Sequence, residues 1–213
     1  MYENPGLAGL GTHDELRRHR LESGDLAPEI IGGINLDEGT ADSGIPLGFV
    51  VRPGRPWRRA LWSQHLTEGQ ASDRSYPPCH RWFPHRSWPV AVQPPPEGSL
   101  DEESLDALLD TLSRWSVDGP GTDCVAFYAS LPAGDFDDPH VWRGPLSAVP
   151  ELIEDRGGPY PFSPTNLWPT DRSWFIWTDY DLLGTKVSGP RQLVEAVKIH
   201  PALETVDWSA QPH

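Results

Sequence analysis

The chain has 213 residues and a net charge of −14, from 17 Lys and Arg against 31 Asp and Glu. This excess of acid disfavours nucleic acid, which proteins bind through a basic footprint, and it disfavours an anionic membrane surface. It favours a basic protein as partner, because opposite charges steer two proteins together. A simpler role for the same charge is to keep the protein in solution.

The cysteines and the N-terminus indicate the compartment. Two cysteines, Cys79 and Cys124, are too few for the disulfide framework of a secreted domain. The opening residues MYENP lack the basic and apolar regions of a signal peptide. Every apolar run is far shorter than the roughly 20 residues that a membrane span needs. We therefore expect a cytoplasmic protein that does not contact a membrane.

The many prolines and glycines shape the expected fold. With 24 Pro and 20 Gly, the chain is suited to short elements joined by long ordered loops. We predict an α+β fold with a mixed or mainly antiparallel sheet and a few amphipathic helices on one of its faces. One domain is predicted over residues 1–213, and any division would fall at residues 94–98, beside three consecutive prolines.

The first half of the chain carries one helix signal and three short strand signals. Thr12-His13-Asp14-Glu15 has the pattern of a capping box and predicts a helix over residues 13–23. Strands are predicted at residues 47–52, 57–64 and 88–93, where β-branched and aromatic residues gather between turn signals. Residues 65–88 show no period and are predicted to form a long ordered loop.

The middle of the chain holds the clearest amphipathic helix. A second capping box is expected at Ser99-Leu100-Asp101-Glu102, and the helix should end before Gly119. Its apolar residues share one face and are Leu105, Leu108, Leu109, Leu112 and Trp115. A buried strand at residues 123–131, a loop at 132–145 and a short helix at 150–155 should follow.

Residues 171–208 predict a strand–turn–strand–helix–strand unit packed into the core. The run Trp174 to Trp177 is continuous and apolar, which favours a strand over 173–178 that is buried on both faces. We expect a turn at 179–181, a returning strand at 183–188, a helix from Gly189 to His200 and a last strand at 203–208. Trp168, beside Pro169, is expected in a loop.

Cys79, His80 and His85 are spaced in a way that suggests a zinc site. Thiolate and imidazole are zinc ligands, and a fourth ligand could come from His65 or Asp73. A structural zinc site usually has two short pairs of ligands, and this cluster offers one. The alternative is a buried small thiol with loop histidines, so no metal is assigned.

No sequence motif assigns catalysis or a cofactor. Cys124 or Cys79 could pair with a histidine as a nucleophile, but Cys124 begins an apolar strand, where a thiol is buried and inert. The chain contains no P-loop, no G-x-S-x-G elbow and no G-x-G-x-x-G after a strand. The sequence therefore favours a non-enzymatic role, leaves a small-molecule enzyme as the alternative, and predicts no cofactor.

The candidate binding residues lie around the predicted C-terminal hairpin. They are Trp168, Asp171, Arg172, Asp179 and Asp181. Trp faces bind sugars, flat heterocycles and cations, and paired carboxylates hold cations or transfer protons. Folding alone offers an alternative for most of them, since Asp is a common turn residue and Trp a common core residue.

The same region carries a family-like string. Trp168-Pro169-Thr170-Asp171-Arg172-Ser173-Trp174, followed by Thr178-Asp179-Tyr180-Asp181 and Thr185-Lys186-Val187-Ser188-Gly189, resembles the C-terminal region of uncharacterised actinobacterial proteins with a W-P-x-D-R-S-W … D-x-D … T-x-V-x-G pattern. The resemblance covers about the last 50 residues and assigns no activity. The acidic, Trp-bearing layout is also similar in style to bacterial toxin-immunity proteins.

Two functional hypotheses from different classes follow. The first is a non-enzymatic acidic binding protein, an immunity-like or antitoxin-like partner of a basic protein, because many aromatic residues suit interface hot spots. The alternative is a small-molecule enzyme or sensor with its site at residues 168–181. Neither hypothesis defines an oligomeric state.

Overall fold

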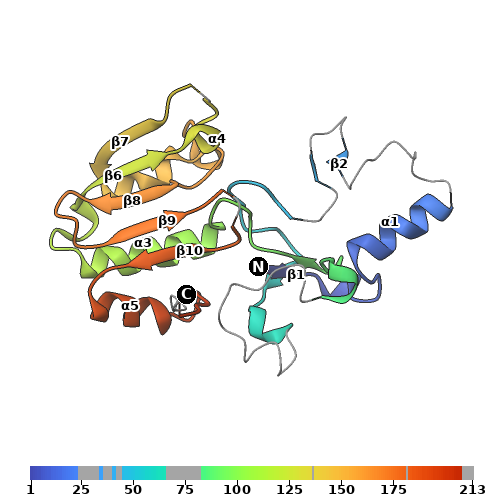
Figure 1. Cartoon of the computed structure of the whole chain (residues 1–213). Helices are drawn as coiled ribbons and strands as arrows, with labels where there is room; N and C mark the ends of the chain where they lie inside the picture. The colour runs from blue at the N-terminus through green and yellow to red at the C-terminus, as the bar shows by residue number, and fades with distance from the viewer. Residues whose placement is uncertain are drawn as a thin grey trace, which may run out of the picture. The chain divides into compact units, whose positions relative to one another are not determined.

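The structure is a computed structural model that describes residues 1–23, 34–35, 40–41, 45–65, 83–135, 137–180 and 182–207 (Figure 1). The chain divides into two compact units. The first, here the N-terminal unit, comprises Met1–Pro46, Pro53–Pro95 and Trp208–His213; the second, here the sheet unit, comprises Leu47–Arg52 and Pro96–Asp207. Each unit is described by itself.

The N-terminal unit is built around a small antiparallel sheet. Its strands are β1 (Tyr2–Glu3), β4 (Arg58–Arg59) and β5 (Val92–Gln93), in the order β4-β1-β5. A separate pair joins β2 (Ile34–Asn35) to β3 (Thr40–Ala41). The strands predicted at 57–64 and 88–93 are thus only two residues long, and Trp62–Gln64 is a 3₁₀ turn instead.

Helix α1 (His13–Glu22) begins where the sequence predicts. The backbone N–H of Thr12 donates to Glu15 Oε2 at 2.8 Å, and the N–H of Glu15 donates to Thr12 Oγ1 at 3.3 Å. Each side chain satisfies a donor that the first helical turn leaves without a partner, so the predicted capping box is confirmed. Residues 66–82 of the predicted long loop lie outside the described residues.

The sheet unit contains a five-stranded antiparallel sheet in the order β10-β9-β8-β6-β7. Its strands are β6 (Asp123–Tyr128), β7 (His140–Pro145), β8 (Asn166–Pro169), β9 (Phe175–Thr178) and β10 (Thr185–Ser188). Helices α3 (Glu102–Trp115) and α5 (Arg191–Lys198) lie against one face of this sheet (Figure 1). The predicted α+β fold is confirmed.

Shorter helical segments complete the sheet unit. Helix α4 (Ser130–Ala133) follows β6, and 3₁₀ turns form at η5 (Gly119–Gly121), η6 (Leu146–Leu152) and η7 (Glu154–Arg156). The predicted α-helix at 150–155 is therefore replaced by 3₁₀ geometry, with Pro150 inside η6. A proline has no N–H to donate along a helix, which is consistent with the irregular turn.

The core of the sheet unit lies between the sheet and the helices. Cys124, Ala126 and Tyr128 are fully buried, while the residues between them along β6 are only half-buried. Alternation with period two is the mark of a strand with one covered face. The predicted leucine face of α3 is confirmed, whereas Trp115 is exposed. The buried helix residues in this core are Leu105, Leu108, Leu109 and Leu112 of α3, with Leu193 and Val197 of α5.

The second predicted capping box is wrong. Asp101 is the N-cap of α3, since its Oδ1 accepts the backbone N–H of Ser104 at 2.8 Å. Ser99 is buried before the helix and binds Ser163 instead. The predicted strand at 47–52 is reduced to single bridges, Leu47 with Glu97 and Val50 with Asp101.

Four predictions for the C-terminal half of the chain are wrong. Trp168 lies in strand β8 rather than in a loop, and residues 140–145, also predicted as loop, form strand β7. The strand at Phe175–Thr178 is buried on one face only, because Phe175 is exposed and Trp177 half-buried. Residues 203–207 are not a strand, and Trp208 lies outside the described residues.

Candidate functional site

Three of the predicted site residues lie at one end of the β8–β9 hairpin, in β8 or in the turn that follows it. Trp168 lies in β8, and its ring stacks on Phe175 of β9 with centroids 5.8 Å apart and planes 29° apart. Asp171 and Arg172 follow in the turn, where Asp171 Oδ1 accepts the backbone N–H of Ser173 at 2.9 Å. Arg172 has a φ of 57°, a left-handed conformation that is uncommon outside glycine.

The other two residues are not brought to this end. Asp179 follows Thr178 at the opposite end of β9, where its carbonyl accepts the backbone N–H of Leu182 at 3.1 Å. Asp181 lies outside the described residues. The structure therefore separates Asp179 from Asp171 by the length of β9, and it assigns the Asp171 carboxylate a turn-forming hydrogen bond.

The face of the five-stranded sheet that points away from α3 and α5 is rich in apolar side chains. Cross-strand register places Val125 opposite Trp168 and Arg143, and Phe127 opposite Val141. Val141 is 66% exposed. The six apolar residues on this face, here called the outer face, are Val125, Phe127, Val141, Trp168, Phe175 and Trp177.

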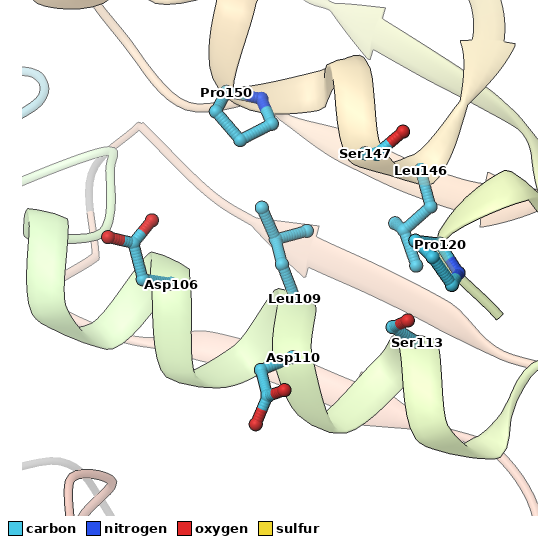
Figure 2. Close-up of a pocket in the computed structure, with 8 residues that line it drawn as sticks. All are labelled: Asp106, Leu109, Asp110, Ser113, Pro120, Leu146, Ser147 and Pro150. Atoms are coloured by element: carbon cyan, nitrogen blue, oxygen red, sulfur yellow. The ribbon is translucent and has the colours of Figure 1, made fainter.

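A groove opens on the opposite side of the sheet unit, between α3 and η6. It has a volume of about 400 Å³. Figure 2 shows Leu109 pointing from α3 toward Leu146 and Pro150, with Asp106 and Asp110 of the same helix beside it. The residues that line the groove are Asp106, Leu109, Asp110, Ser113, Pro120, Leu146, Ser147 and Pro150.

The two carboxylates that line the groove each form an ion pair with an arginine. Asp106 Oδ1 lies 2.8 Å from Arg156 Nη1, and Asp110 Oδ2 lies 2.5 Å from Arg114 Nη2. Hydrogen bonds from Arg156 to Asp106 raise the pKa of the guanidinium above its usual value. The Asp106 and Asp110 side chains remain 53% and 48% exposed, so both are open to solvent.

Acidic charge is concentrated in the sheet unit. Residues 47–52 and 96–207 hold 20 Asp and Glu against 8 Lys and Arg, which is −12 of the total −14. Two of these acids, Asp106 and Asp110, line the groove, and each is paired with an arginine. Other acids of the unit lie on α3 and on the 3₁₀ segments η6 and η7: Glu102, Glu103, Glu151, Glu154 and Asp155.

A third arrangement of polar groups lies where β7 begins. His140 Nδ1 lies 3.1 Å from the Tyr160 hydroxyl, and His140 Nε2 lies 3.6 Å from Asp135. Backbone N–H groups of Asp137 and Asp138 donate to Asp135 and hold the pKa of its carboxyl below the usual value. A carboxylate, an imidazole and a phenol in series are groups that can exchange protons.

The sequence suggested two roles for the cysteines, a catalytic nucleophile and a zinc site. Cys124 is fully buried, and burial raises the pKa of its thiol to about 12, so it does not suit a nucleophile. Cys79 and His80 lie outside the described residues. His85 Nε2 lies 3.0 Å from Glu15 Oε1, and the described residues contain no group of three or more His, Cys, Asp or Glu arranged to hold a metal.

No protein-family model, curated protein or solved structure matches the chain. Among the residues that the structure describes, no helix has both the length and the apolar character needed to cross a membrane. The outer face and the groove are the features that sequence reasoning missed. The sequence signals that relate to the groove are the leucines of α3 and the high content of Asp and Glu.

Proposed function

We propose that the protein is a non-enzymatic binding protein of the cytoplasm, and that its partner is a basic protein rather than a nucleic acid or a membrane. The observation that carries this proposal is the groove between α3 and η6, where the apolar side chains of Leu109 and Leu146 lie beside the carboxylates of Asp106 and Asp110 on α3. The partner inserts a segment in which apolar side chains alternate with Lys or Arg. An immunity protein that neutralises a basic toxin is one protein of this kind.

Leu109 and Leu146 are only 8% and 1% exposed, so the apolar lining of the groove adds a small favourable term, and the acids supply attraction and orientation. Burying apolar surface is the main favourable term in association and is worth about 25 cal/mol per Å². Charges at the border of an interface mainly raise the association rate and exclude wrong partners. A unit with a net charge of −12 attracts a cationic partner over a distance of about one Debye length, ~10 Å at 0.1 M salt.

The existing ion pairs of the groove are compatible with an incoming cation. Exposed pairs such as Asp110 with Arg114 contribute only about 0–1 kcal/mol to stability. A Lys or Arg of the partner can therefore share or replace the arginine at little cost. Asp106 already binds the guanidinium of Arg156 through two oxygens, a geometry that suits arginine recognition.

The proposal is tested by pull-down of tagged full-length protein from native lysate at low and at moderate salt. The groove variant is D106N/D110N, and the matched control is D171N/D179N, which changes the net charge equally on the same unit. Asn at position 171 keeps an oxygen that can accept the Ser173 amide. Circular dichroism and thermal unfolding confirm that each variant is folded.

The expected result is one stoichiometric basic protein that the wild type and the control retain and the groove variant loses. Its recovery should fall as salt rises, because screening weakens attraction between opposite charges. If only the D171N/D179N variant failed to retain the partner, the binding site would lie at residues 168–181 instead of in the groove. That result would favour the alternative hypothesis, which places a small-molecule enzyme or sensor site at these residues. Recovery of no stoichiometric partner at either salt concentration would contradict the binding function itself.

A further inference from the structure

The loop between α4 and β7 carries the one Asp–Pro pair of the sequence, Asp138 followed by Pro139. Both residues are exposed, so water and acid reach the peptide bond that joins them. This bond is a tertiary amide, because the proline nitrogen carries no hydrogen. Such a nitrogen is more basic than that of an ordinary peptide bond, and it leaves more readily once it takes a proton.

The Asp138 carboxylate makes no hydrogen bond or ion pair with the residues that the structure describes. The neighbouring Asp135 differs, because its Oδ1 accepts the backbone N–H groups of Asp137 and Asp138 at 3.0 and 3.2 Å. The second of these bonds holds the amide of Asp138, and Pro139 restricts Asp138 to extended backbone. Rotation of the Asp138 side chain then brings its carboxylate to the main-chain carbonyl carbon of the same residue.

We propose that the Asp138–Pro139 bond is a self-cleavage site, and that the cleaved protein persists as two associated chains. An Asp138 carboxylate oxygen attacks the main-chain carbonyl carbon of the same residue and forms a cyclic anhydride. The bond from this carbon to the Pro139 nitrogen breaks, and the nitrogen takes a proton from solvent acid and leaves as an amine. One water then opens the anhydride, so the net change is hydrolysis of one peptide bond. Attack within one residue is favoured over attack by free water.

The topology of the sheet unit holds the two products, residues 1–138 and 139–213, together. Strand β6 belongs to the first product and lies between β7 and β8, which both belong to the second. The Trp174 indole N–H of the second donates to Ser116 Oγ of the first at 2.9 Å. The core joins the leucines of α3 to buried residues of β8, β9 and α5. Neither product has a complete core alone, so the two remain folded together.

Cleavage also changes the status of the groove between α3 and η6. Helix α3 lies in the first product and η6 in the second, so the walls of the groove come to belong to different chains. The ion pair of Asp106 with Arg156 then joins the two chains. Every residue that lines the groove is kept. The cleavage site stands on the chemistry of its own loop, so it does not rest on the binding function proposed above.

Incubation of the purified full chain at pH values from 3 to 7 tests the proposal, with intact-mass spectrometry as the readout. The wild type should yield residues 1–138 and 139–213, whose masses sum to that of the chain plus one water. Cleavage should be faster at lower pH, because the Pro139 nitrogen needs a proton; the other titratable groups of this loop are Asp135, Asp137 and His140. D138A should stay intact. The matched control D137A removes a neighbouring carboxylate but keeps the bond, and it should be cleaved as the wild type is.

Size-exclusion chromatography measures the association of the products, at the lowest pH where circular dichroism shows D138A to be folded. The products should elute together in this buffer and separately in denaturant. A wild type that stays intact at every pH, or a D138A variant cut after residue 138 as fast as the wild type, would overturn the cleavage site. Products that elute separately without denaturant would overturn the two-chain form.

Discussion

Ser99 and Ser163 are joined by reciprocal hydrogen bonds just before α3 begins. The Ser99 hydroxyl lies 2.9 Å from the Ser163 hydroxyl and accepts the backbone N–H of Ser163 at 2.8 Å. The Ser163 hydroxyl accepts the backbone N–H of Leu100 at 3.1 Å. Both serines are buried, so the segment before α3 is tied to the segment before β8.

Replacing Ser99 by Ala should destabilise the protein by about 1–3 kcal/mol, because the buried N–H of Ser163 loses its acceptor. Chemical denaturation followed by circular dichroism measures the change. Ser173→Ala is the control, since Ser173 is exposed and its backbone N–H, not its hydroxyl, donates to Asp171. Equal stability of S99A and S173A would show that the serine pair contributes nothing.

Leu112 is fully buried on the face of α3 that packs on the sheet. Its replacement by Ala should lower the free energy of unfolding by about 2–5 kcal/mol, the range for large-to-small changes in a core. Chemical denaturation of L112A beside the wild type measures this loss.

The control for Leu112 is Val117, which follows Ser116, the C-cap of α3, and is 90% exposed. V117A removes apolar atoms that are already in water, so it should stay within about 0.5 kcal/mol of the wild type in the same experiment. A loss of stability in V117A as large as that in L112A would contradict the assignment of the buried face.

The Cys124 thiol should resist modification in the folded protein. Burial raises its pKa from 9.0 to about 12, so at pH 8 roughly one thiol in ten thousand is ionised. Iodoacetamide should label Cys124 only after denaturant is added, and peptide mapping by mass spectrometry separates it from Cys79. Fast labelling of Cys124 in the native protein would contradict its burial.

The same shift predicts how stability depends on alkaline pH. The folded state keeps the Cys124 proton more tightly than the unfolded chain does, so this contribution to stability is complete below pH 9 and is lost between pH 9 and about 12. Comparing the wild type with C124A over this range isolates the effect, because the alanine variant lacks the titrating thiol. An identical pH dependence of the two proteins would contradict a contribution of Cys124 ionisation to the loss of stability.

Local patterns predicted the elements that local chemistry determines. The Thr12–Glu15 box and the leucines of α3 act within a few helical turns, so they can be recognised from spacing alone. Strands β7 and β8 escaped prediction because Gly144, Pro145 and Pro169 are turn signals, and both strands are held by pairing with β6. Pairing between distant segments leaves little trace in a short window of sequence.

The candidate surfaces were harder to predict, for the same physical reason. The apolar run Trp174–Trp177 was interpreted as buried on both faces, since sequence does not show whether a second layer covers a sheet. The groove has one wall from α3 and another from η6, and only folding brings Leu109 to Leu146. Predicted binding residues at 168–181 came from residue type, which does not reveal that Asp171 and Asp179 occupy opposite ends of β9.

The most direct test of the binding function is an NMR titration of the full chain with a synthetic amphipathic Lys/Leu peptide, comparing the wild type with S113W. Ser113 lines the groove, so an indole at this position fills it without changing the charge. Binding in the groove predicts amide shifts that concentrate on α3 and η6, weaken as salt rises and disappear in S113W. Shifts that spread over all acidic surfaces and persist unchanged in S113W would contradict it.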